Sequence, residues 1–393
     1  VILERMDTFG GTWETHKYPG VRSDSDLYTF GYRFKPWVGA PIASAEEILK
    51  YMGEVIEENG IGEHIRYGRR ITACSWDSKT NLWTVETSGK HGNETWTCNF
   101  LWMCQGYYDH EKPYIPNWPG MDRYKGLLIH AQLWDPKIDY KGKRVLVIGS
   151  GATAATVIPE FAKDAAHVTM LQRSPTYFFC SENKNELADK LRAGGIDEPT
   201  IHRVVRAQIM YDQDMMTQRC INEPDQVFEE LKELVRAFTG KPDFQFEPHF
   251  VPKYRPWQQR LAFCPEGDIF RAQAHVQQYA RFQHASGAVD RVGEILVATD
   301  VQGMAGDGDL SVSPHRHRVR LVRASADRRV HHAARAEIHV EDAPGGQSRH
   351  AVVVGLGGAQ QAGGPPRRIA GRHRDVEVLG RAPDHQPGDE HRD

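Results

Sequence analysis

A glycine-rich turn is the clearest group of residues in this sequence that could carry chemistry. It has the pattern G-x-G-x-x-A and consists of Gly149, Ser150, Gly151, Ala152, Thr153 and Ala154. In such a turn the first glycine permits a tight bend, the second lets a pyrophosphate approach the backbone, and the small last residue lets helix and strand pack closely. The amino end of the following helix adds amide donors and a positive dipole. The turn therefore predicts a dinucleotide-binding site, and the alternative is a turn with a purely structural role.

The end of the next strand indicates which dinucleotide is bound. An NAD site ends this strand in Asp or Glu, which would repel a 2′-phosphate. Here the strand is followed by Arg173 and Ser174, and a guanidinium matches the geometry of a phosphate. We therefore expect NADP(H), and the alternative is an arginine that is ion-paired on the surface.

The elements around this turn have the lengths that a βαβ unit requires. Residues 143–148 predict a buried strand, a helix is expected through Phe161, and residues 167–171 predict a second strand. Together they span about 30 residues, as one βαβ unit does. Residues 183–240 are expected to be largely helical, and such an insert would cover the approach to the nucleotide fold.

The front of the chain predicts a second, less complete nucleotide fold. Val1 to Glu4 resemble the end of a buried strand, and an acid closing such a strand can hold a ribose hydroxyl. The glycine turn of that fold would lie before Val1, so the chain is expected to be short at its front. From its position alone, Glu4 is better explained as a surface glutamate. Residues 45–60 predict a helix, residues 64–105 alternate like strands, and residues 100–104 predict a buried strand.

Residues 1–272 resemble the class B flavoprotein monooxygenases, and specifically the Baeyer–Villiger members. Residues 124–135 fit the fingerprint F-x-G-x-x-x-H-x-x-x-W followed by Pro or Asp, with Tyr124 in place of Phe. Relatives that oxygenate nitrogen and sulfur share the Gly and His but lack the Trp-Pro/Asp ending. The resemblance implies an α/β fold with two Rossmann-like domains, one for FAD and one for NADP. It also implies that His130 ties down the linker between them.

The same resemblance implies the residues of the site. Arg260 and Asp24 would be the catalytic pair, with Asp24 orienting the guanidinium. Gln259 stands where many relatives have Lys, which puts one NADP contact in doubt. The residues implied to contact the flavin, its ribose or the nicotinamide are Glu4, Gly11, Thr12, Trp13, Arg22, Ser23 and Asp24.

The implied reaction uses both cofactors. NADPH reduces FAD, reduced flavin adds O2, and the resulting C4a-peroxide, stabilised by the charge of Arg260, attacks a ketone to give an ester or lactone. Two alternatives stay open: a monooxygenase that oxygenates nitrogen or sulfur, and an inactive remnant that at most binds NADP through residues 140–175. The sequence does not select among ketone and sulfide substrates.

Bulk composition narrows the class of protein. The 393 residues are 40% apolar and 26% charged, with a formal charge of −3, which predicts a globular protein without attraction to nucleic acid or membrane. No apolar run approaches the ~20 residues of a membrane span. The six cysteines show no metal-type spacing and are expected to be free thiols in the cytoplasm.

The composition changes abruptly after Ala272. Residues 1–272 contain every Cys, Trp and Lys, whereas residues 273–393 contain no Lys, Trp, Cys or Asn. We expect an FAD-binding domain with the linker at 1–138, an NADP-binding domain at 139–272 with a helical insert at about 180–250, and an atypical tail at 273–393. The tail is interpreted either as disordered, since few large apolar side chains offset ordering entropy, or as an out-of-frame translation.

The frame slip is testable at the gene. Residues 315–321, HRHRVRL, can be encoded by codons that spell IVTASG when translated one base later, and the resemblance implies that a strand of this type closes the NADP domain. A slip just after Ala272 is therefore expected. Sequencing the gene through this region should reveal a continuous alternative frame resembling the family, and an intact frame with no such alternative contradicts the slip.

Overall fold

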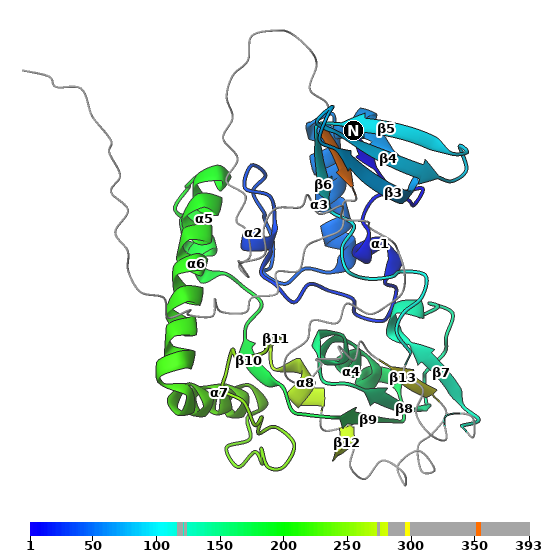
Figure 1. The fold of residues 1–393 in the computed structure, drawn as a ribbon. Coiled ribbons are helices and arrows are strands. Elements are labelled where there is room, and N and C mark those ends of the chain that lie inside the picture. The colour runs from blue at the N-terminus through cyan, green and yellow to red at the C-terminus, as the bar shows by residue number, and fades with distance from the viewer. Residues whose placement is uncertain (116–120, 122–123, 273–275, 282–294, 299–350, 355–393) are drawn as a thin grey trace, which may run out of the picture.

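The computed structural model describes residues 1–115, 121, 124–272, 276–281, 295–298 and 351–354. Within these residues the chain is an α/β protein with two parallel sheets, an antiparallel sheet and a helical arm (Figure 1). The predicted fold class, with two Rossmann-like halves, is confirmed for the described residues. Most of the predicted tail lies outside them.

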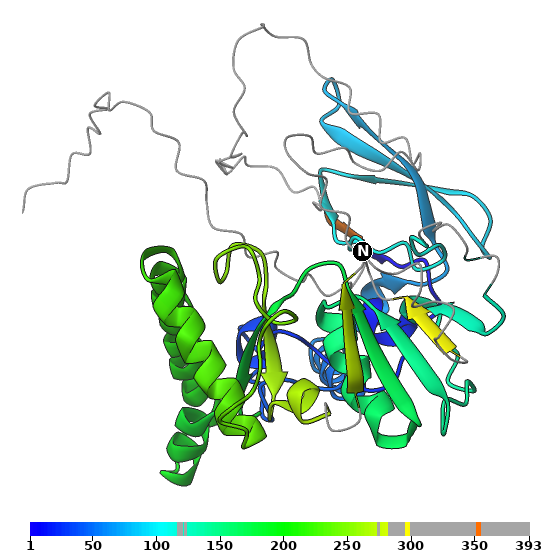
Figure 2. The same cartoon turned by 90° about the horizontal axis from the view of Figure 1, so that it is seen from below.

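The larger sheet has five parallel strands in the order β12-β9-β8-β13-β7, seen side by side in Figure 2. Their bounds are β7 Leu127–His130, β8 Arg144–Ile148, β9 His167–Gln172, β12 Val276–Arg281 and β13 Ile295–Ala298. Alternate residues of β8 face opposite sides, as strand geometry requires. Val145 and Val147 pack with helix α4 (Ala152–Asp164), and Leu146 and Ile148 pack with Leu171, Tyr124 and Leu128. The sheet is therefore covered on both faces by the fingerprint and by the helix that follows the glycine turn.

This sheet extends past both ends of the segment expected to form the NADP-binding domain, residues 139–272. β7 precedes residue 139, and β12 and β13 follow residue 272. The backbone of β13 pairs with both β7 and β8, so hydrogen bonding of the five strands requires residues that the sequence assigned to the linker and to the tail. Local patterning could not reveal this, because strand pairing joins segments far apart in the chain.

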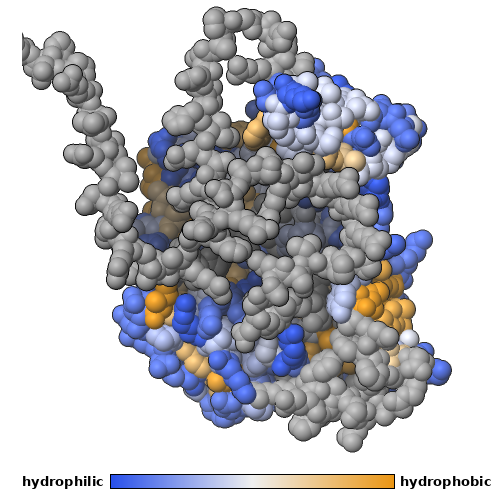
Figure 3. Space-filling model, in the orientation of Figure 1, coloured by the Kyte–Doolittle hydropathy of each residue, from blue (hydrophilic) through white to orange (hydrophobic). Residues whose placement is uncertain are grey.

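The second parallel sheet has the order β2-β1-β14-β6. Its strands are β1 Ile2–Leu3, β2 Ile65–Arg66, β6 Phe100–Met103 and β14 Ala351–Val354. An antiparallel sheet of β3 Arg70–Asp77, β4 Leu82–Ser88 and β5 Glu94–Cys98 lies beside it and shares a small core of Leu3, Val85 and Cys98. The visible surface over the antiparallel sheet is mostly blue and white, as expected for a sheet with one face in solvent (Figure 3).

The prediction of a buried strand at residues 100–104 is only half right. The strand forms as β6, but Phe100 and Trp102 have 49% and 60% of their surface exposed. Leu101, on the opposite face, packs against the core of Leu3 and Val85. One face of β6 is therefore covered by the antiparallel sheet, and no described side chain buries the other.

The helices follow their sequence signals. α3 (Ala45–Glu58) begins with a capping box, in which Ser44 and Glu47 bind each other's backbone N–H. The predicted helical insert forms α5 Glu186–Ala193, α6 Glu198–Asn222 and α7 Pro224–Thr239, the arm at the left of Figure 1. The short elements are α1 Thr12–Thr15, α2 Leu27–Phe30, α8 Asp268–Arg271, the 3-10 turns η1 Ile61–His64 and η3 Ala131–Leu133, and the paired strands β10 Tyr177–Ser181 and β11 Leu261–Pro265.

The arm contacts the front half of the chain through α2. Arg206 of α6 donates from Nη1 to the backbone oxygens of Tyr28, Thr29 and Gly31 at 2.5–3.1 Å. These oxygens lie in and just after α2, where helix carbonyls lack partners within the helix. A guanidinium thus satisfies the carboxyl end of α2 and fixes the arm beside it.

The fingerprint packs onto α4. Trp134 is 5% exposed, and its ring lies 5.4 Å from that of Phe161 on this helix. The ring nitrogen Nδ1 of His130 accepts a hydrogen bond from the backbone N–H of Gln132 at 3.2 Å and so caps the turn after β7. Gly20, with φ of 73°, also approaches α4, where a Cβ would lie 2.4 Å from Cγ of Glu160. The fingerprint and the front loop therefore meet on one helix.

Buried histidines lie at this junction. His16 is 3% exposed, with its ring 5.8 Å from that of His110 and 5.1 Å from that of Tyr108. Nδ1 of His110 lies 3.0 Å from Oγ1 of Thr15. Burial, followed by repulsion from His110 and His130, lowers the pKa of His16 to about 4.

His16→Gln should reduce the acid sensitivity of folding. A histidine whose pKa falls from 6.5 to about 4 on folding stabilises the protein fully above pH 6.5 and loses that contribution as the pH falls toward 4. Between pH 7 and pH 5 this single group removes about 2 kcal/mol of the free energy of unfolding. Urea unfolding at the two pH values checks this. His64→Gln, at an exposed histidine, is the control, and equal pH dependence of parent and His16→Gln contradicts the assignment.

Candidate cofactor-binding and catalytic site

The glycine turn has the form that its sequence predicts. β8 leads into Gly149 at φ of 131°, and α4 begins after Gly151 without any side chain capping its first turn. A Cβ on Gly151 would meet no described protein atom within 4 Å, so the space in front of this backbone is open. Ala154 is fully buried against the sheet, as the close packing of helix and strand requires. Uncapped helix amides beside open space can hold a phosphate.

Ser150 is oriented by its own hydrogen bonds. Its Oγ donates to the backbone oxygen of Ser174 at 2.9 Å and lies 3.0 Å from Oγ1 of Thr176. These contacts join the glycine turn to the residues after β9. Ala152 and Thr153 follow as the first residues of α4, both half-buried.

Arg173 lies where a 2′-phosphate would be expected. It follows the last residue of β9, is exposed, and forms no ion pair with any described residue. Among the described residues the alternative of a surface ion pair therefore has no support. Both Arg173 and the glycine turn lie at the carboxyl ends of β9 and β8, the edge at which parallel sheets bind ligands.

The front loop is shaped by its glycines. Gly10 and Gly11 have φ of 114° and 51°, and a Cβ on Gly10 would lie 2.4 Å from Cδ2 of Leu49. Thr12 begins α1, and Trp13 is 4% exposed with its ring 6.2 Å from that of Phe30. Nε1 of Trp13 is buried and has no hydrogen-bond partner in the described part of the chain.

Glu4 follows β1 and is half-buried. Its Oε1 accepts a hydrogen bond from the backbone N–H of Met6 at 2.8 Å. Burial raises the pKa of the carboxyl, while the Met6 N–H opposes that shift. The carboxylate is therefore directed by the backbone beyond the strand, the place where a ribose would be held.

Asp24 and Arg260 are in contact. Oδ2 of Asp24 lies 2.7 Å from Nη1 of Arg260, across 236 residues of sequence. Arg260 immediately precedes β11 and its side chain is 42% exposed, whereas that of Asp24 is 18% exposed. Ser25 donates to the other oxygen of Asp24 at 3.3 Å. The structure thus joins the two residues expected to form the catalytic pair.

Arg22 and Ser23, the two residues before Asp24, form contacts with other residues of the chain. Nη2 of Arg22 lies 2.7 Å from Oδ2 of Asp268, the first residue of α8. Oγ of Ser23 accepts a hydrogen bond from the backbone N–H of Ala43. Asp268 has no local sequence signal, because its partner lies in a distant segment, and sequence analysis assigned it no role.

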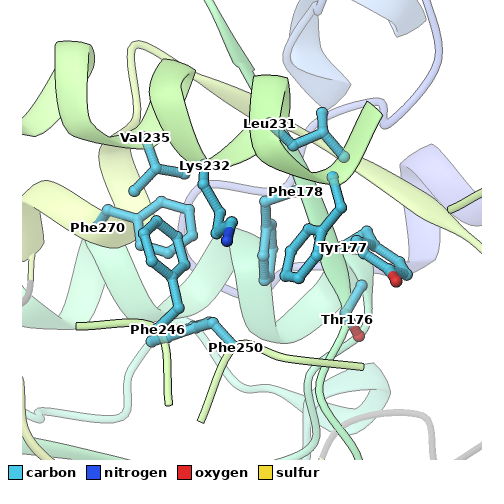
Figure 4. Close-up of a pocket in the computed structure, with 10 residues that line it drawn as sticks. Thr176, Tyr177, Phe178, Leu231, Lys232, Val235, Phe246, Phe250 and Phe270 are labelled. Carbon is cyan, nitrogen blue, oxygen red and sulfur yellow. The ribbon is translucent and has the colours of Figure 1, made fainter. Parts of the chain in front are cut away.

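A small aromatic pocket lies between α7, β10 and α8 (Figure 4). The side chain of Lys232 points into it, with Nζ 4.9 Å from the ring centroid of Phe228 and 2.5 Å from Glu229. Thr176, the partner of Ser150, lines one end. The ammonium group is balanced by an acid and an aromatic face, so this lysine contributes to packing of the arm on the nucleotide fold.

The described residues contain no helix long and apolar enough to cross a membrane. The same residues hold no cluster of three or more His, Cys, Asp or Glu side chains suited to a metal ion. All six cysteines are free thiols.

Comparison with curated proteins identifies relatives along much of the chain. It is 41% identical over 280 residues to the probable FAD-binding monooxygenase AlmA of Acinetobacter sp, covering 69% of this chain and 54% of the relative. It is 38% identical over 276 residues to the FAD-containing monooxygenase EthA of Mycobacterium tuberculosis, covering 70% and 56%. The chain therefore spans about half the length of these relatives.

Solved structures and a family profile point to the same group of proteins as the curated relatives. An oxidized steroid monooxygenase bound to NADP superposes with a TM-score of 0.58 at 21% identity, over 76% of this chain and 65% of that one. The OTEMO complex with FAD and NADP gives a TM-score of 0.58 at 20% identity, over 75% and 64%. At this identity the superpositions establish the fold. A profile of the flavin-binding monooxygenase-like family matches residues 41–187. The glycine turn, the fingerprint and these relatives together establish that the chain belongs to the flavin-binding monooxygenase-like family.

Proposed function

We propose that this chain functions as an NADPH- and FAD-dependent monooxygenase that inserts one oxygen atom of O2 into a ketone, giving an ester or lactone. The observation that carries the proposal is the 2.7 Å contact between Asp24 and Arg260. It brings a fixed cation from the nucleotide half beside the front loop, where the flavin is expected. The relatives are a probable FAD-binding monooxygenase, AlmA, and an FAD-containing monooxygenase, EthA, and the fold resembles that of a structure with FAD and NADP bound.

The nucleotide half fits NADP. The uncapped start of α4 and the open space at Gly151 suit a pyrophosphate. Arg173 offers a guanidinium to the 2′-phosphate, with Ser174 beside it. Ser150 is directed toward Thr176 and keeps the turn in shape. Each of these features suits an anion that lies along the carboxyl edge of the sheet.

The front half fits a flavin. Nε1 of Trp13 is a buried donor that lacks a partner within the described residues, and such groups are costly unless a ligand or water satisfies them. Gly11 and Thr12 expose backbone beside it, and Glu4 offers a carboxylate to a ribose. Arg22 and Ser23 would support this part of the site without contacting the flavin, because their side chains already bind Asp268 and Ala43.

Arg260 has the electrostatic role. NADPH supplies a hydride and the flavin, once bound and reduced, supplies the activation of O2. The guanidinium of Arg260 keeps its positive charge across the physiological range and can stabilise anionic oxygen on the reactants. Asp24 contacts Nη1 of this guanidinium, and 42% of the Arg260 side chain stays exposed. Arg260 and Asp24 thus bind and orient, and the cofactors carry the electrons.

An oxygenase for nitrogen or sulfur is the second candidate. It would use the same cofactors, and the glycine and histidine of the fingerprint suit it equally. The resemblance of residues 124–135 to the Baeyer–Villiger fingerprint, which includes the Trp134–Asp135 ending, favours ketone oxidation. Assay of one ketone and one thioether with the same preparation distinguishes the two candidate functions. Formation of ester without sulfoxide supports ketone oxidation.

Arg260→Ala tests the proposed role of the guanidinium. The purified parent should be yellow with bound FAD and should convert a ketone to an ester when supplied with NADPH and O2. In the variant we expect anaerobic reduction of the flavin by NADPH to continue, while ester formation falls by about 100- to 1000-fold. Stopped-flow absorbance and product analysis measure the two steps. Arg203→Ala, on the exposed side of α6, is the matched control, and undiminished ester formation by Arg260→Ala refutes the role.

Arg173→Ala tests the cofactor preference. Loss of a charge-assisted hydrogen bond to phosphate costs about 1.5–3 kcal/mol, or about a 10- to 150-fold rise in Kd for NADP+. The Kd for NAD+, which lacks the phosphate, should stay within about 2-fold. Calorimetric titration with each nucleotide measures the two Kd values. Arg144→Ala, at the opposite end of β8, serves as control, and a parallel loss for NADP+ and NAD+ contradicts the assignment of Arg173.

A further inference from the structure

Two ion pairs of opposite polarity join residues 22–24 to the two ends of β11. Arg22 binds Asp268, which follows the strand, and Asp24 binds Arg260, which precedes it, each at 2.7 Å. The partners are 246 and 236 residues apart in sequence. Residues 22–24 therefore contribute one cation and one anion, and residues 260–268 contribute the anion and the cation that pair with them.

The loop is held rigidly on its own side. The backbone N–H of Ser23 donates to the oxygen of Ala43 at 2.8 Å, and the N–H of Ala43 donates to Oγ of Ser23 at 3.1 Å. The neighbouring Ile42 exchanges two hydrogen bonds with the side-chain amide of Asn183, just after β10. Movement of residues 22–24 relative to β10 and β11 would break several of these bonds together.

Asp268 is equally well fixed on the other side. Its Oδ1 accepts a hydrogen bond from the backbone N–H of Ile269 at 2.7 Å and one from Sγ of Cys264 at 3.3 Å, while Oδ2 meets Arg22. The side chains of Arg22 and Asp268 are 21% and 22% exposed, against 42% for Arg260. Because solvent screens partly buried charges less, the charge of Arg22 is screened less than that of Arg260.

We propose that Arg22 and Asp268 are positioning residues that hold the loop against β11, so that Asp24 keeps the guanidinium of Arg260 in place. This rests on the proposed function for its catalytic consequence. It changes the role that sequence resemblance implies for Arg22, from a cofactor contact to a support for the loop. Arg260 has a long, half-exposed side chain, so its location depends on where Asp24 lies. The location of Asp24 depends in turn on the Arg22–Asp268 pair.

Asp268→Asn is the first test, because it removes the charge and keeps the shape. Hydrogen–deuterium exchange of the purified chain should rise several-fold in residues 20–26 and 258–262, and Kd for NADP+ should stay within about 2-fold. In the parent that forms ester, kcat should fall about 10-fold with little change in KM, as expected when an interaction made mainly in the transition state is weakened. Glu94→Gln breaks the comparably buried Arg69–Glu94 pair of the antiparallel sheet. This control variant should change neither the exchange of residues 20–26 and 258–262 nor kcat.

The charge-swapped double variant Arg22→Asp with Asp268→Arg is the second test. It should bring exchange of residues 20–26 back toward that of the parent, and Arg22→Lys, which keeps the charge, should stay near the parent. The inference is overturned if Asp268→Asn behaves like Glu94→Gln. It is also overturned if Arg22→Lys alone loses FAD or NADP+ affinity while Asp268→Asn does not, because Arg22 would then contact the cofactor directly.

Failure of this inference is distinguishable from failure of the proposed function. Exchange measurements need no turnover, so a parent without ester formation but with a coupled loop refutes the function and leaves the positioning pair standing. A parent that forms ester, with an Asp268→Asn variant unchanged in exchange and in kcat, refutes only the positioning pair.

Discussion

The contact between residues 22–24 and the ends of β11 is the constraint on which the rest of the site depends. It joins a loop that lines the expected flavin site to a strand of the nucleotide half, through two ion pairs of opposite polarity. Their partial burial limits screening by solvent, and the hydrogen bonds of Ser23 and Asp268 limit their movement. A guanidinium used for electrostatic stabilisation is effective only when its location is set before the reaction begins.

A second constraint is the packing of three segments on α4. Trp134 of the fingerprint contacts Phe161, Gly20 of the front loop approaches Glu160, and the amino end of the same helix adjoins the glycine turn. The helix that would hold a pyrophosphate is therefore also the surface on which the linker and the front loop meet. The fingerprint contributes to this packing directly: its histidine caps a turn and its tryptophan fills the core.

Local signals predicted much of the fold. The strand, glycine turn, helix and strand of residues 144–172, the capping box before α3 and the helical arm are found where periodicity, Gly and capping residues indicated. These signals suffice because each depends on neighbours in sequence. The expectation of a buried strand was only half right, because β6 has one exposed face, and the five-stranded sheet includes β12 and β13 beyond residue 272. Both depend on which distant segments pair or pack, which a local pattern does not contain.

The sequence by itself determined the chemical inventory: a glycine turn with the pattern of a dinucleotide site, an arginine in place of an acid after β9, and a fingerprint that resembles that of the family. Only the tertiary structure showed that Arg22 and Asp268 are in contact. Resemblance assigned Arg22 to a cofactor, but its Nη2 binds a carboxylate 246 residues away. The physical reason is that an ion pair is a property of distance in space. Residue type reveals which charges are available, and only folding brings a particular cation to a particular anion.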